Sequence, residues 1–137
     1  MLFPTFNTAG TGLGVFRTWM DAVSDNLANI NTVRPTSEAA FQARFVVATA
    51  IGSGQEAMSG GPAGSRVSGI SFGNAEGRLA HDPTNPLADA NGMVRLPDID
   101  MGDQMTQLMV AQRGYQANLA VIDRAKDAYQ QALSIGR

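Results

Sequence analysis

Apolar side chains recur at steps of three or four residues along both ends of the chain. At the N-terminal end this line consists of Leu2, Phe6, Ala9, Leu13, Phe16, Met20, Val23, Leu27 and Ile30. At the C-terminal end it consists of Met101, Met105, Leu108, Gln112, Tyr115, Leu119, Ile122, Lys126, Tyr129 and Leu133. Alternating steps of three and four are typical of the contact line of a coiled coil. We therefore expect two long terminal helices that pair as an antiparallel coiled coil.

Proline, glycine and asparagine define the expected ends of the first helix. Pro4 and the glycines at 10, 12 and 14 weaken the first turns, so the helix is expected from about Leu13 onward. Asn29 and Asn31 are expected to close it, because asparagine tolerates the left-handed cap conformation. Pro35 then prevents its continuation.

The C-terminal helix is long for a chain of this size. It is expected to begin after Pro97, with Asp98 or Asp100 as its N-cap, and to stop at Gly136. At 1.5 Å per residue such a helix is roughly 50 Å long. One small domain rarely needs a helix of that length.

Both helices carry a second apolar line beside the first. On the first helix it consists of Val15, Trp19 and Ala22, and on the second of Val110, Gly114, Ala117, Val121, Ala125, Ala128 and Ala132. A helix that is apolar on more than one side is a buried helix. A pair of helices alone would leave the second lines in water, so we expect neighbouring chains to cover them.

The middle of the chain changes to the pattern of β structure. Residues 41–51 and 66–72 are rich in β-branched and aromatic residues and bounded by glycines, and 93–96 can add a short strand. Residues 52–65 read as a glycine-rich loop, and 81–97 as a turn-rich connector.

The expected fold is therefore mainly α, with a small β-hairpin-like module inserted between the helices. Its parts are an N-terminal axial helix (1–35), a central β module and connector (36–97) and a C-terminal axial helix (98–137), the two helices forming one axial coiled-coil domain.

Composition favours a chain that is covered by partners. Hydrophobic residues make up 44% of it and charged residues only 16%, so little polar surface is available to a monomer. The net charge of −2 and the absence of a basic cluster argue against nucleic acid as a partner. With no cysteine and one histidine, His81, disulfides and cysteine-containing zinc sites are excluded, and no cofactor, metal or small-molecule substrate is expected.

The start of the chain and its longest apolar runs indicate whether a signal peptide or a membrane-spanning helix is expected. The first basic residue is Arg17, so the charged start of a cleavable signal peptide is missing. No run of about 18 apolar residues exists, so no membrane-spanning helix is expected.

One enzymatic motif needs to be weighed. Residues 69–73 match the G-x-S-x-G elbow of serine hydrolases around Ser71. That motif requires a sharp turn from a strand into a helix and a histidine base held by an acid. Here glycine and asparagine follow, and only Glu76 lies between Ser71 and His81. A small serine hydrolase is thus the weakest alternative, and we expect no catalytic residues.

Several segments together resemble a known family. Asn26-Leu27-Ala28-Asn29-Ile30-Asn31-Thr32 resembles a motif shared by flagellar rod and hook proteins. The connector, Gln112 to Asn118 and the C-terminal Ile135-Gly136-Arg137 resemble the FlgC family of flagellar proximal rod proteins within that superfamily. The residues that carry the likeness are Asn26, Ala28, Asn29, Asn31, Thr32, Asp82, Pro83, Pro86, Gly92, Pro97, Arg113, Tyr115, Ala117, Asn118, Ile135, Gly136 and Arg137. His81 and Met93 depart from it, because aromatic residues are usual at both positions.

This resemblance implies a structural, non-enzymatic subunit of the proximal rod of the flagellar basal body. Such a subunit polymerises with itself and with other rod proteins into the hollow drive shaft that transmits motor torque across the periplasmic space. It is exported by the flagellar type III apparatus without cleavage of a signal peptide. Another short axial or rod component of the flagellum is the alternative.

The resemblance and the apolar pattern together predict which side chains pack between the helices or between subunits. They are Leu13, Phe16, Met20, Val23, Leu27, Ile30, Met105, Leu108, Tyr115, Leu119, Ile122, Tyr129 and Leu133.

Overall fold

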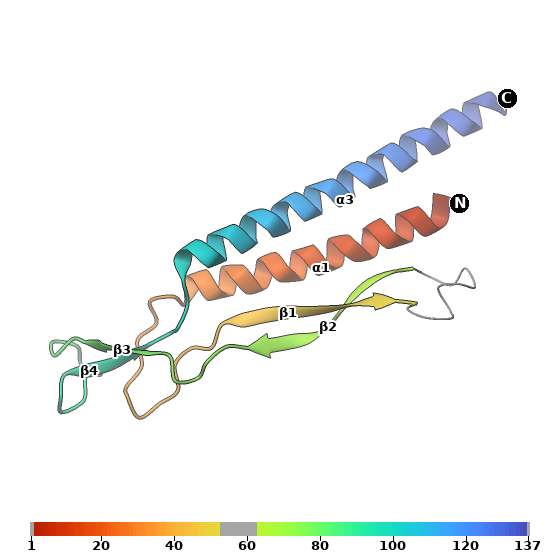
Figure 1. The fold of residues 1–137 in the computed structure, drawn as a ribbon. Helices are drawn as coiled ribbons and strands as arrows, with labels where there is room; N and C mark the ends of the chain where they lie inside the picture. The colour runs from red at the N-terminus through yellow and green to blue at the C-terminus, as the bar shows by residue number, and fades with distance from the viewer. Residues whose placement is uncertain (1, 53–62, 137) are drawn as a thin grey trace.

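Within the described residues, two long helices and two short hairpins make up the fold (Figure 1). The structure is a computed structural model that describes residues 2–52 and 63–136. The elements are α1 (Leu2–Ala28), β1 (Arg44–Ile51), β2 (Gly64–Phe72), β3 (Arg78–His81), β4 (Met93–Leu96) and α3 (Met101–Ile135). The prediction of a mainly α fold with a small β module between terminal helices is confirmed.

The helix α1 lies between α3 on one side and the β1–β2 hairpin on the other (Figure 1). The two helices run antiparallel, so both ends of the chain lie at the same end of the molecule. The β3–β4 hairpin lies at the opposite end, beyond the last turn of α1. None of the helices in the described ranges is long and apolar enough to cross a membrane.

The expected start of the first helix was wrong, because α1 begins at Leu2 rather than near Leu13. Tertiary contacts support the early turns despite their glycines. Asn7 Nδ2 and Thr8 Oγ1 donate to the carbonyl of Ala63, at 3.4 and 3.2 Å. Gly12 is buried, and a Cβ there would lie 2.5 Å from the Asn118 amide nitrogen. Packing against neighbouring elements thus outweighs weak helix propensity.

The first helix does not end in the expected left-handed asparagine cap. Every positive φ angle in the described residues belongs to a glycine. Instead, the backbone N–H and the Nδ2 group of Asn29 donate to the carbonyl of Asp25, at 3.2 and 2.9 Å. Thr32 Oγ1 in turn donates to Asn29 Oδ1 at 3.1 Å. The asparagine side chain therefore adds a second bond to a carbonyl that already accepts an i→i−4 backbone bond, and so reinforces the last turn of the helix.

The second helix has the ends that capping residues predict. Of the two expected N-caps, Asp100 is the one used, and its Oδ1 accepts from the backbone N–H of Asp103 at 2.8 Å. The helix ends at Ile135, with Gly136 as its C-cap.

The hairpin β1–β2 confirms the two expected strands. The strands pair antiparallel from Arg44 opposite Phe72 to Ile51 opposite Gly64, with a bulge after Val47. The expected loop of residues 52–65 is shorter in the structure, since β2 begins at Gly64, and residues 53–62 lie outside the described residues.

The connector is a second hairpin rather than only turns. The strand β3 was not expected, and it pairs with β4 from Arg78 opposite Leu96 to His81 opposite Met93. Arg34 adds a further backbone pair to Arg95, with both N–H···O bonds at 2.9 Å. Gly77 makes the turn into β3 at φ +60°, where a Cβ would lie 2.1 Å from the carbonyl oxygen of Leu96. Only glycine fits there.

Candidate assembly surface

The contact between α1 and α3 uses a part of each of the two expected lines of α3. Leu108, Tyr115 and Ile122 are partly buried there, as part of the first apolar line. Beside them, Gln104, Ala111 and Ala125 are buried. The other seven residues of the expected line are exposed, and they are Met101, Met105, Gln112, Leu119, Lys126, Tyr129 and Leu133. The face of α3 that meets α1 is thus rotated by about one residue from the expected one.

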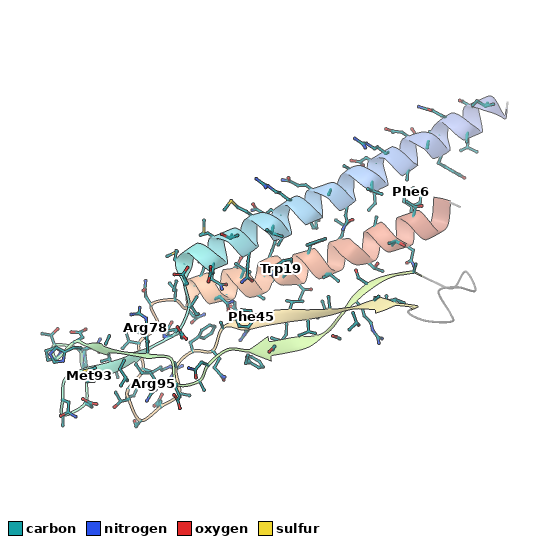
Figure 2. All side chains as sticks on the ribbon, viewed as in Figure 1. Phe6, Trp19, Phe45, Arg78, Met93 and Arg95 are labelled. Atoms are coloured by element: carbon teal, nitrogen blue, oxygen red, sulfur yellow. The ribbon has the colours of Figure 1, made fainter. Side chains whose placement is uncertain are left out.

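Small residues explain this rotation, because they let the two helices approach closely. A Cβ at Gly114 would lie 2.4 Å from the ring of Phe16. The Phe16 ring stacks on Trp19, with ring centroids 6.1 Å apart (Figure 2 labels Trp19). Trp19 Nε1 donates to Gln107 Oε1 of α3 at 3.3 Å. Phe16 therefore fits into a notch that larger residues of α3 would close.

The second apolar line of α1 is covered within the chain, contrary to our expectation. Ala22 is buried and borders a groove of 320 Å³ together with Arg44 and Ile70 of the hairpin. Val15 lies seven residues earlier on the same side of the helix and is partly buried. Trp19 is covered by α3. The hairpin and α3 therefore cover much of this line without a neighbouring chain.

The second apolar line of α3 is mostly uncovered within the chain. Of the described helices and strands, α3 contacts α1 alone. Gly114 and Ala125 lie against α1, whereas the rest of this line is exposed. The large apolar side chains that α3 exposes are Met101, Met105, Met109, Val110, Leu119, Val121, Tyr129, Leu133 and Ile135. A contiguous exposed apolar surface of this kind marks an interaction site.

The exposed area of the whole chain leads to the same conclusion. The chain exposes 9067 Å². A compact protein of 14.4 kDa exposes about 6,800 Å². Most of the buried apolar residues in the described part are alanines. This chain thus exposes more surface than a compact fold of the same mass would.

The end of α3 projects beyond α1. Gly12 lies against Asn118 and Phe16 against Gly114, so the start of α1 is level with about residue 128. The last turns of α3 therefore extend past α1, as Figure 1 shows, and Leu133 and Ile135 are 56% and 85% exposed. This projecting end has no partner among the described helices and strands.

The residues predicted to pack between helices or subunits fall into two groups. Val23 is buried, and Leu13, Phe16, Met20, Leu27, Ile30, Leu108, Tyr115 and Ile122 are partly buried. Met105, Leu119, Tyr129 and Leu133 are exposed. The first group already has contacts within the chain. The role of both groups between subunits stays a prediction.

The first motif of the resemblance has a structural centre in Asn26, whose side chain is fully buried. Its Nδ2 group donates to Gln104 Oε1 of α3 at 2.9 Å and to the Arg44 carbonyl of β1 at 3.0 Å. Its Oδ1 accepts from the Arg44 backbone N–H at 2.8 Å. One amide thus joins α1, α3 and the hairpin. The motif's Asn29 and Thr32 close the helix, whereas Ala28 and Asn31 are exposed.

The connector motif holds the loop between β3 and β4. Gly92 has φ +72°, and a Cβ there would lie 2.9 Å from the His81 ring. Pro97 is fully buried after β4, while Pro83 and Pro86 are exposed in the loop. The Asp82 carboxylate accepts from the side chains of Thr84 and Asn85, at 2.8 and 3.3 Å, and these bonds lower the pKa of Asp82.

A second carboxylate, Asp89, supports the other side of this loop. Its Oδ1 accepts from the backbone N–H groups of Met93 and Asn91, at 3.0 and 2.8 Å, and its Oδ2 accepts from Thr36 at 3.1 Å. The bonds from Met93 and Asn91, in that order, hold the pKa of Asp89 below its ordinary value of 3.8.

We expect acid to loosen this loop only at low pH. Since the folded-state pKa values of Asp82 and Asp89 are lowered, their stabilisation is complete above the ordinary value of 3.8. It is lost as the pH falls through the lower folded-state values. An NMR titration of the Met93 amide should therefore show no change near pH 5 and a large shift below about 3.8. In the Asp89→Asn variant that shift should disappear, and a shift near pH 5 would contradict the account.

The C-terminal motif is partly exposed. Arg113, Ala117 and Ile135 are exposed, Tyr115 and Asn118 lie partly buried against α1, and Gly136 caps the helix. Arg137 lies outside the described residues.

Two residues with structural roles were not predicted from the sequence. Gln104 is 3% exposed and binds Asn26. Arg95 donates to the backbone carbonyls of Thr36, at 2.8 Å, and Glu76, and so joins three segments at β4 (Figure 2). Neither residue stands out in the sequence, because a polar residue at a contact position is recognised only once its partner is known.

The serine-hydrolase motif does not form its required turn. Ser71 is an exposed residue within β2, opposite Phe45, and the chain after β2 continues into a loop and β3 rather than a helix.

Taken together, these features define a class of protein. Paired terminal helices with an uncovered apolar face, a small alanine-rich core and an inserted β module are typical of a subunit that assembles with other chains. Comparison with known proteins identifies the class more closely. A family model described as "Flagella basal body rod protein" matches residues 6–36, and one described as "Flagellar basal body rod FlgEFG protein C-terminal" matches residues 90–135.

Whole-chain relatives give the particular family. The flagellar basal-body rod protein FlgC of Salmonella typhimurium is 31% identical over 136 residues, which cover 99% of this chain and 98% of the relative. FlgC of Bacillus subtilis is 31% identical over 147 residues, covering 98% of each chain. FlgC of Agrobacterium fabrum is 37% identical over 121 residues, covering 87% of this chain and 84% of the relative. The chain belongs to the FlgC family of flagellar basal-body rod proteins.

Proposed function

We propose that this chain is a structural, non-enzymatic subunit of the proximal rod of the bacterial flagellar basal body. It polymerises through its terminal helices, beside copies of itself and other rod proteins, into the hollow drive shaft that carries motor torque across the periplasmic space. The observation that carries this proposal is the apolar face of α3 that no other described element covers. Family membership supports the location.

In the assembled rod, α1 and α3 form one axial coiled-coil domain that lines the inner wall of the tube. The parts of the chain are then an axial helix at 1–35, the β module and connector at 36–97 and a second axial helix at 98–137. The β module lies outside and contacts neighbouring subunits. Burial of each large apolar side chain of α3 contributes about 1.5–3 kcal/mol, and most of that gain comes only when a neighbour covers the helix.

The subunit reaches the rod through the flagellar type III export apparatus, without cleavage of a signal peptide. Membership of a family of flagellar basal-body rod proteins supports this route. No cofactor and no small-molecule substrate take part, and the exposed position of Ser71 near the end of β2, which no helix follows, gives no support to hydrolase chemistry.

Deletion of the gene tests the proposed function directly. We expect the deletion strain to lose swimming in soft agar and to lack complete basal bodies, and the full chain supplied in trans to restore both. A Ser71→Ala chain should restore them equally well. A deletion strain that still swims would contradict the proposal. Restoration by the wild-type chain but not by Ser71→Ala would instead favour the hydrolase.

A further inference from the structure

The backbone groups at the edges of the β1–β2 hairpin are only partly used. In an antiparallel pair, residues whose N–H and C=O point toward the partner strand alternate with residues whose groups point away. Asn26 binds both the N–H and the C=O of Arg44, so these groups point away from β2. The same then holds for Phe72, which lies opposite Arg44, and for Ile70, which lies opposite Val46.

At the other end of the hairpin the roles of the strands are exchanged. The N–H of Ser65 donates to Thr11 Oγ1 at 3.1 Å, and the C=O of Ala63 accepts from Asn7 and Thr8. The backbone groups of Ser65 therefore point away from β1. Those of Ala50, opposite Ser65, consequently point away from β2, and so do those of Ala48, opposite Val67.

The helix α1 thus holds two diagonally opposite corners of the hairpin and leaves the other two open. It binds β1 at Arg44 and β2 at Ser65. Figure 1 shows the cause, because the two strands cross along α1 as the hairpin twists. Among the described residues, no bond to another segment reaches the backbone of the open edges, which we define as Ile70 and Phe72 on β2 and Ala48 and Ala50 on β1.

The open edges lack the features that usually protect an edge strand. All four of these residues are exposed, with Phe72 60% accessible. Residues 45–51 and 67–73 contain neither a charged residue nor a proline. Soluble proteins commonly guard edges with lysine, proline or a covering segment, because free N–H and C=O groups pair with another strand. An uncharged, unguarded edge is suited to backbone pairing with another chain.

We propose that the open edge of β2 pairs with the open edge of β1 in a second copy of this chain, so that hairpins of neighbouring subunits join into one sheet. The pairing is antiparallel when the copies have the same orientation. It sets Ile70 opposite Ala50 and Phe72 opposite Ala48, so that a bulky side chain meets a small one at each position. This inference rests on the proposed function, because the rod is what brings copies side by side.

The geometry of the two edges supports a second copy as the occupant. The backbone groups of Val46 and Val67 also point outward, but these residues are partly buried. Each open edge therefore offers two exposed residues with outward-pointing backbone groups, and the spacing of two is the same on both strands. Phe72 is level with Arg44 in its own hairpin and with Ala48 of the neighbour. Adjacent copies are therefore staggered by four residues of strand, about 13 Å. A contact between two different patches with such an offset continues indefinitely in an open helical assembly.

Cysteine crosslinking in basal bodies tests this pairing, since the chain has no cysteine of its own. Directly paired residues have Cα atoms about 5.5 Å apart, which is within disulfide range. A chain carrying Ile70→Cys and Ala50→Cys is expressed as the only copy, basal bodies are purified, and the disulfides formed on mild oxidation are read from a non-reducing gel. We expect a shift of the chain to dimers and higher multimers.

The matched control carries Ile70→Cys with Thr49→Cys, because Thr49 points to the opposite face of the sheet from Ala50. It should remain monomeric, as should each single-cysteine chain. Swimming of each strain and the presence of the chain in purified basal bodies show that the variants fold and assemble. If the chain is present in basal bodies but stays monomeric on oxidation, or if the control crosslinks equally, the strand pairing is wrong and the rod function stands. Absence of the wild-type chain from basal bodies would overturn both.

Discussion

Replacing Leu119 with aspartate is expected to abolish swimming without unfolding the subunit. Leu119 is 40% exposed on α3, so its side chain is not required for contact with α1. Our proposal places a neighbouring subunit over this position in the assembled rod, where an unpaired carboxylate would cost about 3–5 kcal/mol per contact. Each 1.4 kcal/mol is about a tenfold loss of affinity, so rods should not form.

The measurements are swimming in soft agar and the amount of chain in purified basal bodies. Leu119→Met is the matched control, because it keeps an apolar side chain of similar volume, and it should swim normally. Phe16→Asp should also prevent swimming, for a different reason: it places a charge in the notch at Gly114 between the helices. Normal swimming by both aspartate variants would refute the assignment of these positions to packing.

The second large effect is expected at Asn26. Leucine at this position leaves Gln104 and the backbone groups of Arg44 without their partner, in a site where Asn26 itself is fully buried. An unsatisfied buried group costs about 1–3 kcal/mol, and the two Arg44 groups are at the low end because they are only partly buried. Asn26→Leu should therefore destabilise the subunit by about 3–5 kcal/mol in total.

Urea unfolding of the purified chain followed by circular dichroism measures this change. Asn31→Leu is the control, since Asn31 belongs to the same motif but is exposed, and its unfolding midpoint should stay within error of the wild type. Equal midpoints for Asn26→Leu and Asn31→Leu would show that the buried amide is not what joins the three elements.

Periodicity predicted the elements well where burial follows the helical or strand repeat. The line of Leu108, Tyr115 and Ile122 lies toward α1 as expected. The other residues of that line were assigned to the contact by apolarity but are exposed, and Ala111 and Ala125 make the contact instead, because small side chains allow closer packing. Hydrophobicity shows which positions avoid water, but it does not distinguish a partner helix of the same chain from one of a neighbouring chain.

Features that depend on distant partners could not be predicted. The early turns of α1 hold because of contacts with residues 63–65 and 118, and the strand β3 forms because β4 pairs with it. Gln104 lies 78 residues from its partner Asn26. The motif resemblance marked Asn26 as important, and the structure supplies the reason, which is that one amide serves three elements.

A reconstruction of purified basal bodies from a strain carrying this chain tests the central claim most directly. The account predicts that this chain lies in the proximal rod, with α1 and α3 antiparallel in the inner wall, a neighbouring subunit against Leu119 and the exposed methionines of α3, and the β1–β2 hairpin outside. A rod without this chain, or one in which that face of α3 is open to solvent, would contradict it.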